Sequence, residues 1–107
     1  MRHIGRAVER RARTTGFSVI PELAGHGVGR GIHESPMVWN VENARDRTLL
    51  HEGLVIAIEP FLTTGVPAIV EDDDGWTLRT VDGAVAAQFE HTIVVTAGEP
   101  IVVTAAA

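Results

Sequence analysis

Gly25-His26-Gly27-Val28-Gly29-Arg30-Gly31-Ile32-His33-Glu34 is the most distinctive segment of the sequence. Two histidines seven positions apart are separated by glycines, which lack side-chain bulk and permit backbone turns that other residues resist. This composition predicts a loop in which the imidazole nitrogens of His26 and His33 can approach a ligand closely.

Two acidic residues further along the chain each lie within an apolar, strand-like run. Glu59 follows Leu54-Val55-Ile56-Ala57-Ile58, and Glu90 precedes His91-Thr92-Ile93-Val94-Val95. A carboxylate on a buried strand is costly unless a cation meets it. We therefore expect the fold to bring these glutamates to His26 around metal. The alternative for Glu59 is a carboxylate at a strand edge that points to water, because strand alternation allows either orientation.

Composition limits the chemistry that is available. The chain has 107 residues, 45% of them hydrophobic, which predicts a single domain with one compact core. There is no cysteine, so disulfides, thiolate metal sites and cysteine nucleophiles are excluded. Histidine and carboxylate remain as the strong metal ligands. These ligand types accept manganese, iron, cobalt or zinc, and the sequence does not choose among the four metals.

Charge and hydropathy argue against two classes of partner. The net charge is -5 and the basic residues, all arginine, lie mostly near the N-terminus, so nucleic-acid binding is not expected. No apolar run approaches the roughly 18 residues of a membrane-spanning helix, and the start lacks a signal-peptide core. We expect no membrane association and a cytoplasmic location.

Periodicity predicts the α+β class, with one N-terminal helix packed on a mostly antiparallel sheet. The helix is expected from His3 to Thr14 and is ended by Gly16. Further expectations are an irregular segment over 37–53, in which Asn40 is a turn former, and one long element over 84–96. Four strands complete the set: 17–20, 54–59, and a pair at 67–71 and 76–80 joined by an Asp-Gly turn. A short run at 101–104 pairs with the long element.

The remaining polar clusters have simpler interpretations. His3 and His51 lie in polar surroundings without a pattern, and a lone histidine is more often a structural or surface residue than a ligand. The acidic run Asp72-Asp73-Asp74 is too short for a calcium loop and lacks the spacing of one, so it is interpreted as a turn. One imidazole and two carboxylates therefore remain as the candidate site, with a second histidine nearby for a substrate.

These segments together resemble the methionine aminopeptidases, metal-dependent peptidases of the pita-bread fold. The resemblance rests on Gly25-His26-Gly27-Val28-Gly29, Ile58-Glu59-Pro60, Asp74-Gly75-Trp76-Thr77 and Ala87-Gln88-Phe89-Glu90-His91-Thr92, which appear in the family's order and spacing. The short interval between His33 and Glu59 is similar to type I, because type II enzymes carry a large insertion there. The resemblance implies the C-terminal half of a pita-bread fold, so that residues 1–107 would be a single partial domain.

The resemblance also implies roles for individual residues. His26, Glu59 and Glu90 would bind divalent metal, two ions in a complete site, with Glu90 bridging them. Glu59 and His33 would be catalytic, as the general base and as the group that binds the scissile amide and its oxyanion. Trp76, His33 and the position of Ile32 would contact the substrate, a peptide or new protein with an N-terminal methionine. The implied reaction is removal of that methionine.

Two departures from the family pattern affect these expectations. Ile32 replaces a usual aromatic residue of the methionine pocket. The family also uses two aspartates and a further histidine upstream of the matched region, whereas no aspartate precedes Asp46. We therefore expect weak two-metal binding and little or no peptidase activity from these residues alone. A fragment of a longer protein, a mis-assigned start codon and a natural half that pairs with another chain all fit.

Two other functions stay open. An inactive pita-bread module that acts by binding would tolerate the missing ligands, although it has no need to keep His26, His33, Glu59 and Glu90 together. A peptidase of the same fold that cleaves Xaa-Pro peptides is the other, and Trp76 and the Gln88-Phe89-Glu90 context weigh against it. A substrate panel separates the peptidases.

Overall fold

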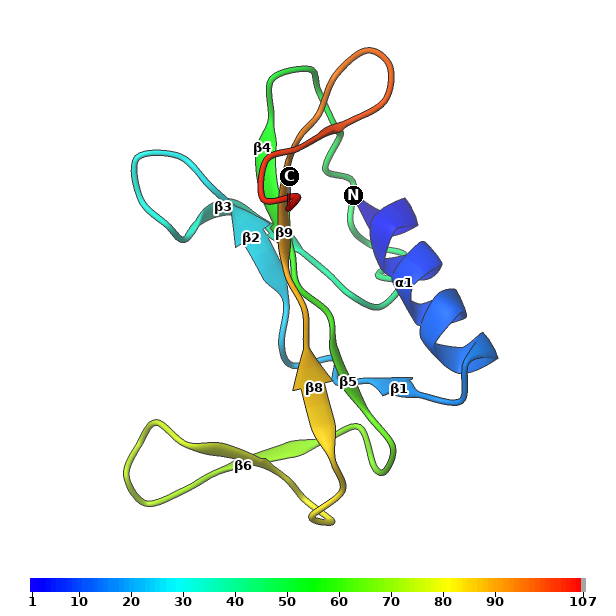
Figure 1. Ribbon diagram of the computed structural model, residues 1–107, viewed down its shortest axis with the longest axis vertical. Coiled ribbons are helices and arrows are strands. Elements are labelled where there is room, and N and C mark those ends of the chain that lie inside the picture. Colours follow the sequence, from blue (N-terminus) through cyan, green and yellow to red (C-terminus); the bar gives the residue numbers. More distant parts are fainter. Residues whose placement is uncertain (107) are drawn as a thin grey trace.

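The computed structural model describes residues 1–106; residue 107, the last of the predicted domain, lies outside the described residues. One helix, α1 (Arg2–Thr14), lies beside a set of short antiparallel strands (Figure 1). The strands are β1 (Ser18–Val19), β2 (Gly25–Gly27), β3 (Glu34–Val38), β4 (Val55–Ile58), β5 (Phe61–Thr63), β6 (Ile69–Glu71), β7 (Leu78–Thr80), β8 (Ala86–Gln88), β9 (His91–Val94) and β10 (Ile101–Val102). The predicted α+β class is confirmed.

The strands form three sheets. The largest has five strands in the order β10-β9-β4-β2-β3, and a three-stranded sheet has the order β1-β5-β8. The β6–β7 hairpin forms the third sheet and extends away from the rest of the molecule (Figure 1). Besides the connection from β1 to β2, the chain crosses between these two sheets at two places, from β4 to β5 and from β8 back to β9. The two predicted acidic ligands lie at these two crossings.

The core lies between α1 and one face of the five-stranded sheet. Met1, Val38 and Ile56 are buried there, with Ile4, Leu54, Ile58 and Ile93 packed against them. Leu54, Ile56 and Ile58 alternate along one strand, so they share this face as their spacing predicts. The opposite face of β4 is therefore free to carry polar chemistry.

Apolar spacing and the residues at its C-terminal end explain why α1 forms where it does. Its apolar positions recur at helical spacing, and Gly5 and Ala12 are buried. Arg11 and Arg13 in the last turn complement the helix dipole. Gly16, just beyond the end, has φ +83°, a conformation that glycine adopts without a Cβ clash. In the described residues, no helix has the length and apolar content required to cross a membrane.

The prediction of a loop over the Gly-His-Gly segment is wrong at its start. Gly25, His26 and Gly27 form β2, which lies between β4 and β3 inside the sheet. A Cβ on Gly25 would collide with the carbonyl of Ala57, and one on Gly27 with the carbonyl of Ser35. The glycines therefore allow neighbouring backbones to approach closely rather than allowing a turn. Only residues 28–33 form the loop.

Two other expectations need correction. The single long element expected over 84–96 is two strands, β8 and β9, which belong to different sheets with Glu90 between them. The segment expected to be irregular from residue 37 begins inside β3, and Asn40 is buried rather than exposed in a turn. Residues 39–54 otherwise lack strands. Both errors arise because local sequence does not reveal which strand each segment meets.

The predicted hairpin across Asp72–Gly75 is confirmed, because β6 and β7 pair with Glu71 opposite Leu78. Asp74 closes the turn: its carboxylate accepts hydrogen bonds from the Thr77 hydroxyl and from the amides of Trp76 and Thr77. The Thr77 hydroxyl, followed by these amides, lowers the pKa of Asp74 below its ordinary value. The acidic run is thus used in a turn.

Truncation of the core provides a test of this packing. Ile56→Ala is expected to lower the free energy of unfolding by about 2–5 kcal/mol, because Ile56 is 0% exposed and its removal leaves a cavity. Leu49→Ala is the matched control, since Leu49 is 81% exposed and should change stability by less than about 0.5 kcal/mol. Urea unfolding followed by circular dichroism measures both. Equal losses would show that Ile56 is not in the core.

Candidate metal centre

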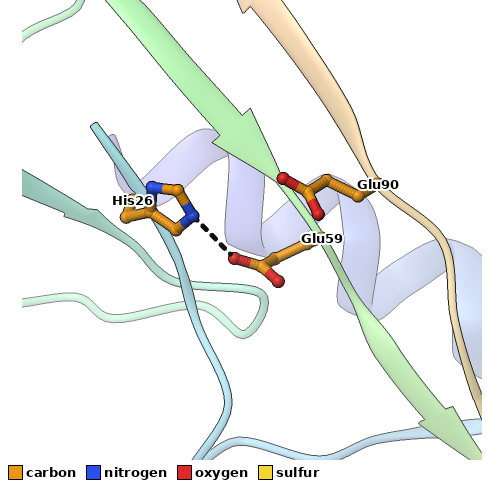
Figure 2. A group of neighbouring side chains, drawn as sticks. All are labelled: His26, Glu59 and Glu90. Atoms are coloured by element: carbon orange, nitrogen blue, oxygen red, sulfur yellow. Dashed lines mark ion pairs between the residues drawn. The ribbon is translucent and has the colours of Figure 1, made fainter. Parts of the chain in front are cut away.

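Strand register brings His26, Glu59 and Glu90 to one place. His26 on β2 is opposite Ala57, and Glu59 lies two residues beyond Ala57 on the same strand face. On the other side of β4, Ile58 is opposite His91, so continuing the register by one residue places Glu59 opposite Glu90. Figure 2 shows the three side chains together. One ligand atom from each lies within 4.8 Å of those of the others.

The His26 ring is oriented for a cation. Its Nδ1 lies 2.8 Å from the carbonyl oxygen of Gly27. A carbonyl can only accept, so Nδ1 carries the proton and, in the neutral ring, Nε2 presents a lone pair. Nε2 lies 3.2 Å from Oε1 of Glu59. Two acceptor atoms this close need a proton or a metal ion between them.

Glu59 has little other compensation for its burial, whereas Glu90 is exposed to solvent. No arginine forms an ion pair with Glu59 or Glu90 in residues 1–106, and the Glu59 side chain is only 14% exposed. The Gln88 amide nitrogen lies 3.4 Å from Oε2 of both glutamates and joins them weakly. One imidazole and two carboxylates that converge with a lone pair aimed at their centre fit a divalent metal.

A cavity of about 620 Å³ opens next to this cluster. His26, His33 and Glu59 line its polar side, and the His33 ring meets the His26 ring edge-on with centroids 4.3 Å apart. Its apolar lining comes from Leu23, Met37, Trp39 and Phe61. The cavity can therefore accept an apolar side chain while its polar end faces the candidate metal ligands.

Glu34 closes the loop that carries His33. Its Oε1 accepts a hydrogen bond of 2.6 Å from the amide of Gly31. The same carboxylate lies under Gly29, where a Cβ would collide with it. The glycine at 29 thus lets the loop fold over Glu34, and the loop returns His33 to the wall of the cavity.

Two predicted substrate residues lie apart from this cavity. Trp76 is 86% exposed at the end of the β6–β7 hairpin, and Ile32 is 73% exposed in the loop before His33. Neither lines the cavity beside the candidate metal ligands. The chain on its own brings together His26, His33, Glu59 and Glu90, and leaves Trp76 and Ile32 open to solvent.

Sequence reasoning gave no role to three residues that contact this region. The sequence pattern places Gln88 in a motif and makes Asn40 a turn former, and it assigns no site role to Glu34, although all three side chains form hydrogen bonds here. For Gln88, its position two residues before Glu90 on a strand is a usable signal, because both then share a face. The role of Asn40 has no local signal, because its hydrogen-bond partners, the carbonyls of Leu23 and Glu59, are distant in the sequence.

The model of metallopeptidase family M24 matches residues 1–97. The chain belongs to this family. Within metallopeptidase family M24, it is 51% identical to methionine aminopeptidase 2 of Bacillus subtilis over 102 residues, which cover 94% of this chain and 41% of the relative. It is 43% identical to the Escherichia coli methionine aminopeptidase over 96 residues, with 90% and 36% covered.

Structural comparison agrees with this assignment to family M24. The Thermotoga maritima methionine aminopeptidase superposes with a TM-score of 0.88 at 38% identity, over 94% of this chain and 40% of that chain. The resemblance to methionine aminopeptidases and the α+β, partial pita-bread fold are confirmed. The chain spans about two-fifths of the length of the relatives described above.

Proposed function

We propose that this chain takes part in the metal-dependent removal of N-terminal methionine from peptides and newly made proteins. The convergence of His26, Glu59 and Glu90 within 4.8 Å carries the proposal, because no arginine of residues 1–106 pairs with either carboxylate. Relatives that bear the name methionine aminopeptidase at 43–51% identity support this substrate. The cytoplasm, where proteins are made, is the location that the proposal implies.

The ligand set fits divalent manganese, iron, cobalt or zinc, and in a complete site His26, Glu59 and Glu90 would be three of the ligands that hold two ions. Bound metal would supply Lewis acidity and make water a stronger nucleophile. The carboxylate of Glu59 would accept a proton from the attacking water. The His33 imidazole, at the cavity wall, would donate a hydrogen bond to the oxygen that gains negative charge during cleavage.

Substrate selection is proposed to depend on the cavity. Leu23, Met37, Trp39 and Phe61 supply apolar contact for a side chain such as methionine. Trp76 and Ile32 remain proposed substrate contacts, to be completed by protein surface that covers the exposed hairpin and loop. Because the chain spans about two-fifths of its relatives, we propose that residues 1–107 are a partial domain whose site a further polypeptide segment completes.

A chimeric enzyme tests the proposal in a complete context. The 102 residues of the Bacillus subtilis relative that match this chain are replaced by this chain's residues, and hydrolysis of Met-Ala-Ser is measured with added manganese or cobalt. Metal-dependent release of methionine is expected, with no cleavage of an Ala-Pro dipeptide. The chain alone should cleave neither peptide.

Other outcomes support the other functions. A folded chimera that binds metal and cleaves only Ala-Pro favours the Xaa-Pro peptidase. A folded chimera that neither binds metal nor cleaves either peptide favours a binding module. Cleavage of Met-Ala-Ser by the isolated chain would contradict our proposal that a further segment completes the site.

A further inference from the structure

Asn40 is one of the two buried polar side chains of the described residues, with 1% exposure, and it lies close to the candidate metal centre. Its Nδ2 donates to the carbonyl oxygens of Leu23 and Glu59, at 3.0 and 3.2 Å. Both partners can only accept, so the nitrogen rather than the oxygen of the amide must face them. Burial leaves this side chain little freedom to adopt another arrangement.

The strand register explains why Asn40 reaches both segments. Gly25 on β2 is opposite Val38 on β3, and continuing this pairing by two residues places Asn40 opposite Leu23. Because β2 lies between β3 and β4, the Asn40 amide spans the ends of all three strands. It therefore ties the segment that leads to His26 to the segment that carries Glu59.

The Glu59 carbonyl has a particular need for this donor. It lies in the break between β4 and β5, outside the hydrogen bonds of either strand. The next residue is Pro60, which has no amide hydrogen and restricts the backbone conformation of Glu59. A side-chain donor from the segment that follows β3 therefore supplies the hydrogen bond that this break in the strands lacks.

We propose that Asn40 is a positioning residue of the metal centre: its amide fixes the main chain of Glu59 relative to the strand that holds His26. The 3.2 Å approach of Glu59 Oε1 to His26 Nε2 depends on that relation, because the two ligands come from different strands. The inference rests on the proposed metal-dependent function, although its geometric part can be measured without metal.

Two substitutions and a matched control test this role. Asn40→Ala removes both hydrogen bonds, and Asn40→Asp also turns a carboxylate oxygen toward two carbonyl oxygens. The control is Thr63→Val. Thr63 is also 1% exposed, and its hydroxyl donates to the carbonyl of Val85 and accepts from the amide of Gly65, so its loss destabilises the fold elsewhere.

The first readout is Co²⁺ affinity, measured by titration of the 107-residue chain at a temperature where circular dichroism shows each variant folded. Both Asn40 variants should bind Co²⁺ about tenfold or more weakly, the range seen when a group that orients a metal ligand is lost. Thr63→Val should stay within twofold of the wild type. Equal affinities in all four proteins would overturn the proposal and leave Asn40 with a structural role alone.

The second readout needs no metal and separates this inference from the proposed function. In histidine-labelled protein at one fixed pH, the His26 ring resonances should shift in the Asn40 variants and stay unchanged in Thr63→Val. If the wild type binds no Co²⁺, the metal centre proposed for this chain fails, and the His26 resonances still decide the positioning role. Unchanged resonances in folded Asn40 variants would overturn it.

The wild-type protein decides the matter if both Asn40 variants unfold. Its Asn40 side-chain amide protons should exchange slowly with solvent and give nuclear Overhauser contacts to Glu59. Rapid exchange without such contacts would show that the amide does not hold the Glu59 backbone.

Discussion

Glu59→Gln in the chimeric enzyme is expected to lower kcat/KM for Met-Ala-Ser by about 10³-fold or more, a loss typical of removing a general base. Glutamine has nearly the same size as glutamate, so the fold around the break between β4 and β5 should be retained. The substitution removes the negative charge beside His26 Nε2 and the proton acceptor proposed for the attacking water. Metal affinity should fall as well, because one of the three ligands loses its charge.

Glu22→Gln is the matched control for this prediction. Glu22 lines the same cavity but does not belong to the ligand cluster. The Glu22→Gln substitution also removes one negative charge near the site, so its effect on kcat/KM measures the general electrostatic contribution of the cavity. A comparable loss in both variants would assign the Glu59 effect to the field of the cavity rather than to ligation or proton transfer.

His33→Ala is expected to have the second largest effect. In the chimeric enzyme kcat/KM should fall by about 10²–10³-fold, as when one donor to a developing oxyanion is removed. Metal affinity should stay within about threefold, because His33 is outside the ligand cluster, although its ring packs edge-on against His26. Steady-state kinetics and calorimetric metal titration measure the two quantities separately.

The exposed His51 is a control for the loss of any histidine, and His51→Ala should leave both quantities unchanged. A large fall in metal affinity for His33→Ala would contradict the assigned role. It would show that His33 binds metal, or that its contact with the His26 ring holds that ligand in place.

Local patterns were sufficient for much of this chain. The spacing of Ile4, Ala12 and the arginines predicts α1, and the Asp-Gly turn predicts the β6–β7 hairpin. The glutamates could be singled out because each interrupts an apolar run, which is costly without a cation. Their convergence with His26 follows from the register of β2, β4 and β9.

Other features depend on backbones that are distant in the sequence. The Gly-His-Gly segment has the composition of a loop, yet it is a strand because its glycines admit the carbonyls of Ala57 and Ser35 at close range. Asn40 is a residue type that favours turns, yet it is buried here. Burial is tolerated because its amide nitrogen donates hydrogen bonds to the carbonyl oxygens of Leu23 and Glu59. Periodicity reports which face a residue occupies and does not report which neighbour that face will meet.

Co²⁺ titration of the 107-residue chain beside His26→Ala, followed by visible absorption, tests most directly whether His26, Glu59 and Glu90 form a metal centre. The account predicts weak binding by the wild type, with absorption bands of cobalt bound to nitrogen and oxygen ligands, and no such bands for His26→Ala. Equal binding by both proteins, or none by a folded wild type at millimolar cobalt, would contradict it.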